Sequence, residues 1–411
     1  MANWVAYIEK IASRYNGKTS INASDLVGNT YNTSIYSQID IFEIINEPDM
    51  VQNISALDYL NCLKVAHNTI KKVRPEAKIM LGGLAIITSK FFSDLKTSYI
   101  MEDGVKKYFW DYIDIFNFHY YTTNPANLIG VANKIHDAML AANVNKETWL
   151  TEFGYTTYYV SEYLKSTDLP KQMLIALALG INKIFAYQFR CSDLTVGDVN
   201  NAEGYFGLIH RSTNVSSISI LDGLSNDKAL SDGDGLLNVK STDGIFLLNI
   251  DSSIKDKIKT NGMYLKLHDC DLSNITINGE IVYQESNAGV KEIALEATLF
   301  SLIENGDHVE IHTLNYSTDD TWKGLETTPA YYSVKYLNSL LQNGATRPIL
   351  YKDSEVYKIK WNDARGNHIE AVWSDESTSE ITTNKIVMDY LGNIINAVNI
   401  TINNEIKYFI S

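Results

Sequence analysis

The chain lacks the features that mark disulfide-rich, nucleic-acid-binding and membrane-spanning proteins. Its 411 residues include three cysteines, Cys62, Cys191 and Cys270, which are odd in number and far apart, so they predict neither a disulfide framework nor a metal site. Lys and Arg number 35 against 49 Asp and Glu, and the net charge of −14 argues against a nucleic-acid partner, because phosphate binding needs clustered basic side chains. No apolar run is long enough to cross a bilayer, so we expect no membrane span.

What the chain does contain is the composition of a globular protein with a sizeable core. Hydrophobic residues make up 45% and charged residues 20%, which is ordinary for such proteins. A length of 411 residues allows two or three domains. The 26 tyrosines and 6 tryptophans suit stacking against sugars, but they suit ordinary cores equally well.

The first half of the chain alternates apolar strands with amphipathic helices. We predict helices at 4–15, 55–74 and 126–143 and one that starts near Pro170, and strands at 39–45, 78–81, 112–118, 149–152 and 183–189. Strands that are apolar throughout and alternate with helices form a parallel sheet covered on both faces. The pattern therefore predicts an α/β fold of the (β/α)8 TIM-barrel type, in which these five strands fit the latter half, strands four to eight.

From residue 213 the periodicity changes to mostly two, which predicts antiparallel strands. Asn278-Gly279 between two such strands is a strong signal for a two-residue hairpin. The helical pattern returns once, at 328–341, with a threonine cap and a proline in the first turn. We expect a final hairpin within 400–410. These patterns predict a partial TIM barrel at 1–212 and 323–345, an inserted β-rich domain at 213–322, and a C-terminal β-sandwich at 346–411.

Two of the predicted strands stop abruptly at a glutamate. The apolar run at 39–45 leads to Glu47 and is ended by Pro48, which has no N–H to give to a strand ladder. The strand at 149–152 stops at Glu152. Carboxylates at the carboxyl ends of parallel strands lie where α/β barrels keep catalytic groups, and two on one rim are what glycosidic bond cleavage requires. The pattern therefore favours a carbohydrate-cleaving site built on Glu47 and Glu152.

The segments around these glutamates resemble those of clan A glycoside hydrolases. Glu-Ile-Ile-Asn-Glu-Pro at 43–48 is similar to the Asn-Glu-Pro signature of their fourth barrel strand, and Trp-Leu-Thr-Glu-Phe-Gly at 149–154 to the nucleophile segment of the seventh. Asn-Phe-His-Tyr-Tyr at 117–121 is similar to the sixth-strand segment, and Tyr-Phe-Gly-Leu at 205–208 to the stretch after the eighth. The likeness is closest to the group around families five and thirty-nine, and it covers the chain outside the inserted domain.

The resemblance implies roles for individual residues. It implies Glu47 as general acid/base, which must be protonated at the start, and Glu152 as nucleophile. Asn46 would hydrogen-bond the sugar 2-hydroxyl, and Tyr121 or His119 would contact the nucleophile or the sugar. Carboxylates on these two strands should lie about 5–5.5 Å apart, which implies retention of anomeric configuration. The substrate would be an oligo- or polysaccharide, and no metal or other cofactor is implied.

The chain departs from the family pattern in two places. Relatives end the eighth strand with a tryptophan that forms a sugar platform, whereas this chain has Ala-Tyr-Gln-Phe at 186–189, so either Tyr187 substitutes or the platform comes from elsewhere. The first three barrel strands also have no counterpart, and an open half-barrel would expose strand edges and an apolar face. We therefore expect a second polypeptide, an alternative closure or a dimer to supply the rest, unless the sequence is a fragment.

The sequence supports two functions from different classes. The first is a retaining β-glycosidase or endo-β-glycanase. The second is a non-catalytic saccharide-binding or cell-surface structural protein that keeps the barrel rim but lacks a complete site. For either function we expect a secreted or cell-surface location, although the first residues carry no cleavable signal sequence.

Overall fold

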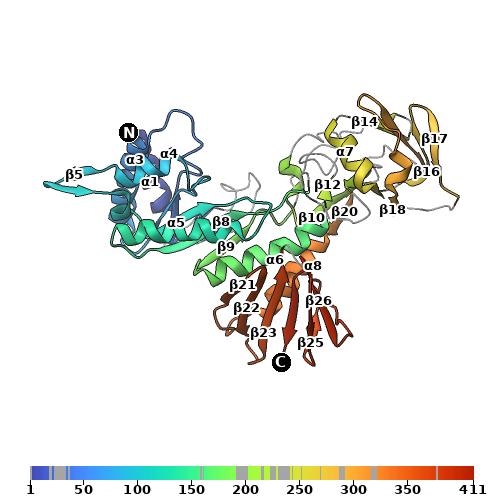
Figure 1. Ribbon diagram of the computed structural model, residues 1–411. Helices are drawn as coiled ribbons and strands as arrows, with labels where there is room; N and C mark the ends of the chain where they lie inside the picture. The colour runs from blue at the N-terminus through green and yellow to red at the C-terminus, as the bar shows by residue number, and fades with distance from the viewer. Residues whose placement is uncertain are drawn as a thin grey trace. The chain divides into compact units, whose positions relative to one another are not determined.

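The chain forms two compact units (Figure 1). The first comprises Met1–Tyr121, Ala126–Phe153 and Leu179–Phe185, and the second comprises Thr122–Pro125, Gly154–Ala178 and Ala186–Ser411. The computed structural model describes residues 2–17, 21–22, 34–35, 38–157, 160, 162–190, 202–213, 217–222, 228–229, 241–242, 244–250, 252–268, 270–286, 292–315, 322–375 and 378–411. The division into three domains stays a prediction.

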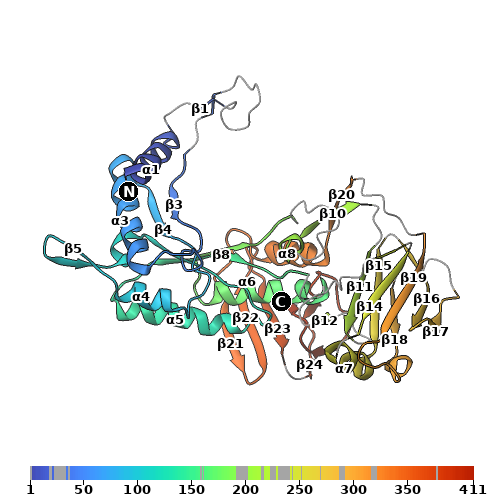
Figure 2. The ribbon, with the colours of Figure 1, turned by 90° about the horizontal axis from the view of Figure 1, so that it is seen from above.

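The first unit is built on a five-stranded sheet in the order β3-β4-β7-β8-β9 (Figures 1 and 2). Its strands are Ile41–Ile44, Lys78–Leu81, Ile115–His119, Glu147–Phe153 and Lys183–Ala186. The pairs β3–β4, β4–β7 and β7–β8 are parallel, so the expected parallel sheet is confirmed. The third strand begins at Ile115 and not at residue 112, because the 3-10 helix η1 (Phe109–Tyr112) takes up the preceding residues.

The helices described in the first unit are α1 (Ala2–Arg14), α3 (Ala56–Val73), α4 (Lys90–Thr97) and α5 (Asn127–Ala141). A capping box starts α3: Ser55 Oγ accepts the N–H of Asp58, and the Asp58 carboxylate accepts the N–H of Ser55. The buried face of α3 includes Tyr59, Leu63 and Ile70, and α1 packs against this helix. Two short antiparallel pairs complete the unit, β1 (Ile21–Asn22) with β2 (Ser34–Ile35) and β5 (Ile100–Glu102) with β6 (Val105–Lys107).

Helix α6 (Glu162–Ala178) of the second unit corrects one prediction. We expected a helix that starts near Pro170, but this proline lies inside α6. Proline removes one backbone hydrogen bond from a helix interior, and burial of the flanking Leu169 and Leu174 offsets that loss. Helix α8 (Pro329–Leu340) packs against α6 and is capped as predicted, since Thr328 Oγ1 accepts the N–H of Tyr331.

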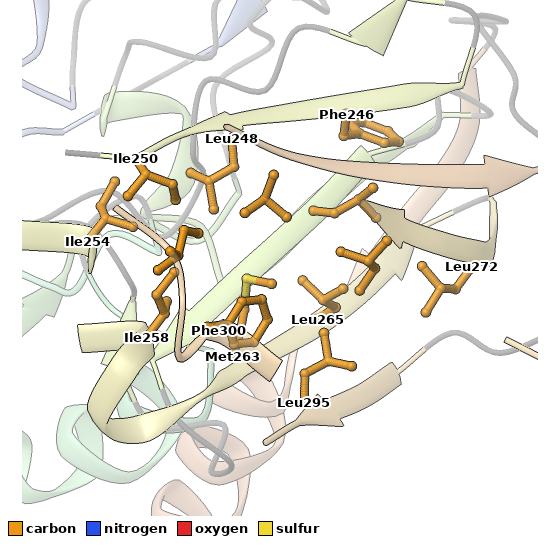
Figure 3. Packing of buried hydrophobic residues seen from close by; sticks show 14 of the residues in the cluster. Phe246, Leu248, Ile250, Ile254, Ile258, Met263, Leu265, Leu272, Leu295 and Phe300 are labelled. Carbon is orange, nitrogen blue, oxygen red and sulfur yellow. The ribbon is translucent and has the colours of Figure 1, made fainter. Parts of the chain in front are cut away.

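Two antiparallel sheets, an α-helix and the 3-10 helix η3 (Ala297–Phe300) are described next in the second unit. The sheets have the orders β12-β11-β15-β18 and β13-β14-β19-β16-β17, and their strands are Ser217–Asp222 (β11), Lys228–Ala229 (β12), Ser241–Thr242 (β13), Ile245–Asn249 (β14), Met263–His268 (β15), Asp271–Ile277 (β16), Glu280–Gln284 (β17), Glu292–Leu295 (β18) and His308–Leu314 (β19). Phe246, Leu265 and Phe300 lie in their common core (Figure 3). The strands β10 (Ile209–Thr213) and β20 (Trp322–Thr327) pair with each other beside this region of the sequence.

The hairpin prediction in this region is confirmed, but one helix was missed. Asn278 and Gly279 have φ of 50° and 86° and form the two-residue loop between β16 and β17. Helix α7 (Ser252–Asn261) lies in the segment for which we expected mostly strands. The sequence does contain a helical pattern here, because Ile254 and Ile258 are four residues apart, and both are buried in the structure.

The C-terminal strands form a five-stranded antiparallel sheet, β21-β22-β23-β27-β25, and a two-stranded sheet, β24-β26. Their bounds are Ile349–Asp353 (β21), Val356–Asn362 (β22), His368–Ser374 (β23), Ser379–Thr382 (β24), Ile386–Met388 (β25), Asn399–Ile402 (β26) and Lys407–Ile410 (β27). The expected final hairpin is wrong, because β26 pairs with β24 while β27 pairs with β23 and β25. Ile400 and Ile402 are buried in one cluster with Val372 and Phe409, which favours pairing in separate sheets.

No helix in the described ranges is long and apolar enough to span a membrane. Cys62 and Cys270 are free thiols, and Cys191 lies outside the described residues.

Candidate active site

A sharp turn after β3 carries Glu47. Ile45 and Glu47 have φ of 66° and 45°, in the left-handed region that residues with side chains seldom adopt. A Cβ on Gly82 would overlap the carbonyl oxygen of Ile45, so the glycine lets the end of β4 pass close to this turn. The carboxylate of Asp49 accepts two backbone N–H groups from the segment after β4, at 3.0 and 2.8 Å. The close contact with Gly82 and the hydrogen bonds of Asp49 therefore hold this turn against the segment that follows β4.

Four predicted site residues meet at the carboxyl end of the sheet. His119 Nδ1 lies 2.8 Å from Glu47 Oε1 and 3.5 Å from Glu152 Oε2. The Tyr121 hydroxyl donates to Glu152 Oε2 at 2.8 Å. The imidazole of His119 is 1% exposed, whereas the side chains of Glu47 and Glu152 are 31% and 27% exposed. The two carboxylates thus share one buried histidine and remain accessible from solvent.

Backbone contacts bring these strand ends into register. A register irregularity after Phe118 makes His119 the partner of Glu152 on the neighbouring strand. The N–H of Tyr120 donates to the carbonyl oxygen of Glu152 at 2.9 Å, and the N–H of His119 donates to that of Leu84 at 2.9 Å. We expected Tyr121 or His119 to contact the nucleophile, and the structure brings both to Glu152.

A further carboxylate, Glu43, lies on β3 beneath this cluster. Its Oε1 accepts the backbone N–H of Gly83 at 2.8 Å and the side-chain amide of Asn117 at 3.0 Å. Part of the side chain is exposed, but loss of solvent around the carboxyl group raises the pKa of Glu43 above its usual range. Sequence reasoning assigned no role to Glu43, although a charged residue inside an apolar strand is itself a signal.

Two further residues were predicted to belong to the site, Asn46 and Tyr187. Asn46 is exposed in the turn next to Glu47. Tyr187 belongs to the second unit, where its hydroxyl donates to Glu203 Oε2 at 2.9 Å and its ring packs edge-on against Phe206, with centroids 5.4 Å apart.

The cluster also has the donor atoms for one cation. One ligand atom each from Glu47, His119 and Glu152 lies within 4.8 Å of the other two. Carboxylate oxygens and an imidazole nitrogen suit zinc and similar metals. His119 Nδ1 already makes a hydrogen bond with Glu47 Oε1, and Glu152 Oε2 accepts one from the Tyr121 hydroxyl.

Comparison with known proteins finds a likeness of fold to solved structures. No family model matches the chain, and no curated protein matches its sequence. The structure is similar to that of a family 39 glycoside hydrolase from the gut symbiont Bacteroides cellulosilyticus WH2, with a TM-score of 0.51 and 13% sequence identity. That similarity covers 100% of this chain and 62% of the other, so this chain spans less than two thirds of the enzyme's length.

Two further solved structures superpose less well. The endo-β1,6-glucanase BT3312 has a TM-score of 0.44 at 11% identity, over 98% of this chain and 63% of that one. An endo-laminarinase from Formosa Hel1_33_131 has a TM-score of 0.33 at 12% identity, over 42% and 55% of the two chains. The structural neighbours are glycoside hydrolases, and at these identities the likeness is one of fold.

Proposed function

We propose that this chain is a retaining glycoside hydrolase that cleaves β-glycosidic bonds in oligo- or polysaccharides. Glu47 is its general acid/base and Glu152 its nucleophile. The observation that carries the proposal is the pair of partly exposed carboxylates that share the buried His119 at the carboxyl end of one parallel sheet. The similarity in fold to a family 39 glycoside hydrolase supports the same class of reaction.

Double displacement assigns each carboxylate two tasks. In the first step Glu47 gives its proton to the leaving glycosidic oxygen while Glu152 attacks the anomeric carbon, which forms a covalent glycosyl-enzyme. In the second step Glu47 takes a proton from water, and this water attacks the anomeric carbon and releases Glu152. Oxygens of the two carboxylates within 4.8 Å of each other favour direct attack by Glu152 over attack by an intervening water.

The surrounding side chains orient these groups and the sugar. Tyr121 donates to Glu152 Oε2 and so restricts rotation of the nucleophile. His119 contacts both carboxylates and keeps them at a fixed separation. Asn46, in the turn next to Glu47, binds the sugar 2-hydroxyl.

Trapping the covalent intermediate tests this proposal. A 2-fluoro-sugar with a good leaving group should label Glu152. Fluorine destabilises the oxocarbenium-like transition states of both steps, and the good leaving group speeds only the first, so the covalent intermediate forms faster than it is hydrolysed. Glu152→Ala should remove nearly all activity, and azide should restore turnover with inverted product. Glu47→Ala should spare activated aryl glycosides, which need no proton, and reduce cleavage of natural glycosides by at least ~10²-fold. Mild, equal losses in both variants without an adduct would favour the saccharide-binding alternative.

We further propose that this TIM-barrel type sheet is completed by a second copy or a second polypeptide. The sheet order leaves β3 and β9 as its outer strands, and Phe185 on β9 is 45% exposed. Outer strands with unpaired backbone groups are ready sites for association. Sedimentation of the isolated chain should therefore detect a dimer or a need for a partner. A monodisperse, active monomer would contradict this part of the proposal.

A further inference from the structure

Glu43 connects three strands of the sheet below the catalytic cluster. It lies on β3, four residues before Glu47, and its Oε1 accepts the side-chain amide of Asn117 on β7 at 3.0 Å. Asn117 is fully buried, and its Oδ1 accepts the hydroxyl of Thr151 on β8 at 2.7 Å. Thr151 directly precedes Glu152. The hydrogen-bonded chain therefore joins the same three strands that lead to Glu47, carry His119 and carry Glu152.

The second donor to Glu43 touches the histidine of the cluster. The backbone N–H of Gly83 donates to Glu43 Oε1 at 2.8 Å. A Cβ on Gly83 would overlap Nε2 of His119, so the imidazole lies directly against the backbone that Glu43 holds. The opposite ring nitrogen, Nδ1, lies between Glu47 and Glu152. A shift of Gly83 therefore moves the ring that contacts both carboxylates.

We propose that Glu43 is a positioning residue that fixes His119, and through it the two carboxylates, by holding Gly83 and Asn117. The proposal rests on the function proposed above and adds a residue outside the predicted set. Without this acceptor, the N–H of Gly83 and the side-chain amide of Asn117 lose their hydrogen bonds to Glu43, and Gly83, which follows β4, is no longer held by a side chain of β3. A misplacement of about 1 Å in a catalytic site is enough to reduce turnover by ~10²-fold.

Two substitutions of Glu43 distinguish its role as a hydrogen-bond acceptor from the effect of its negative charge. Glu43→Gln keeps a side-chain oxygen at the same place for the two N–H donors but carries no charge. Glu43→Ala removes the acceptor altogether. If positioning is the role, Glu43→Gln retains kcat within about fivefold, whereas Glu43→Ala lowers kcat by ~10²-fold with little change in KM. Equal losses in the two variants would overturn positioning, because charge alone would then account for the effect.

The matched control is a glutamate at the other end of the same sheet. Glu147 accepts from Lys78 Nζ and Trp149 Nε1 at 2.9 and 2.8 Å, so it also has two donors. It is the first residue of β8 and therefore lies at the end of this strand opposite to Glu152. Glu147→Ala should leave kcat within about twofold. A loss equal to that of Glu43→Ala would mean that any damage to the sheet has this effect, and the proposal would fall.

A readout that needs no turnover separates this inference from the proposed reaction. In protein with ¹⁵N-labelled histidine, the imidazole signal of His119 can be assigned by its disappearance in His119→Gln. Glu43→Ala should shift this signal, while Glu43→Gln and Glu147→Ala should leave it in place. An inactive wild-type protein in which Glu43→Ala still shifts the signal would refute the glycosidase proposal and support the positioning role. An unchanged signal in Glu43→Ala would overturn the positioning role whatever the activity.

If Glu43→Ala fails to fold, Thr151→Val tests the same chain of contacts. Valine has a similar shape but cannot donate to Asn117 Oδ1, so the amide is freed at its other end. The expected result is the same shift of the His119 signal with a smaller loss of kcat, about tenfold. No shift and an unchanged kcat would contradict the positioning chain.

Discussion

The two ends of the parallel sheet hold the same type of residue in opposite electrostatic surroundings. At the amino end, Glu147 pairs with Lys78 Nζ at 2.9 Å, and this hydrogen bond lowers the pKa of Glu147. At the carboxyl end, Glu43 lies among amide donors near Glu152, and loss of solvent raises the pKa of Glu43. One end therefore stabilises the charged form of a carboxylate, and the other opposes it.

The two ends of strand β8 show the same contrast: its first residues help to hold the sheet together, and its last residues belong to the candidate active site. Glu147 and Glu152 are the first and sixth residues of β8. The former joins β8 to β4 through Lys78, and nearby Trp149 packs with Met80 and Ile115 in a small core. The latter is 27% exposed and contacts a histidine and a tyrosine. An ion pair at one end links the strands of the sheet, whereas the carboxylates at the other end stay partly exposed to solvent.

The largest expected loss of activity comes from Gly83→Ala, which adds a methyl group at the carboxyl end of the parallel sheet. Gly83→Ala places a Cβ against the His119 ring, which is 1% exposed. The ring must turn away from Glu47 and Glu152, so we expect kcat/KM to fall by ~10²-fold or more. Steady-state kinetics on an aryl β-glycoside measures the loss.

Gly130→Ala is the matched control for this substitution. Gly130 lies within α5, and a Cβ there would have no atom within 4 Å. Alanine also forms helices better than glycine, so stability should rise by up to about 1 kcal/mol while activity stays the same. Retention of full activity in Gly83→Ala would show that the position of His119 does not matter.

A smaller effect is expected from the hydroxyl of Tyr121. Tyr121→Phe removes the hydrogen bond to Glu152 Oε2 but keeps the ring. Hydrogen bonds to charged groups contribute about 1.5–3 kcal/mol, and because Tyr121 is 40% exposed, water can partly replace it. We therefore expect about a tenfold loss of kcat. Tyr99→Phe, at a tyrosine that is 42% exposed, should have no effect, and an equal loss there would contradict a specific role.

The carboxyl end could be foreseen from sequence only in part. The apolar run before Glu47, the following Pro48 and the strand before Glu152 are local patterns, and the structure does bring the two glutamates together. The roles of Gly83 and Glu43 depend on contacts between β3, β4 and β7, which no local periodicity encodes. The same reason applies to β26, whose partner was set by burial in a distant cluster and not by the short loop to β27.

The smallest expected effect is on the pH dependence of the unfolding free energy, which should have opposite signs for Glu147 and Glu43. The pKa of Glu147 is lowered in the folded protein, so its contribution to stability is present above the unfolded pKa and is lost as the pH falls through the folded pKa. The pKa of Glu43 is raised, so its contribution is present below the unfolded pKa and is lost as the pH rises through the folded pKa. An unfolded glutamate titrates at about 4.3, so the change for Glu147 falls at and below this pH, and the change for Glu43 falls at and above it.

The variants Glu43→Gln and Glu147→Gln, which cannot ionise at these positions, allow the two opposite pH dependences to be measured. The difference in unfolding free energy between wild type and each variant, from urea titrations between about pH 3 and 7, cancels the groups that are unchanged. Relative to Glu147→Gln, wild type should gain stability as the pH rises, by less than about 1 kcal/mol because the pair with Lys78 is partly exposed. Relative to Glu43→Gln, wild type should lose stability as the pH rises, because the pKa of Glu43 is raised in the folded protein. Slopes of the same sign would mean that both ends of the sheet treat a carboxylate alike, and the contrast between a stabilising end and a reactive end would then fail.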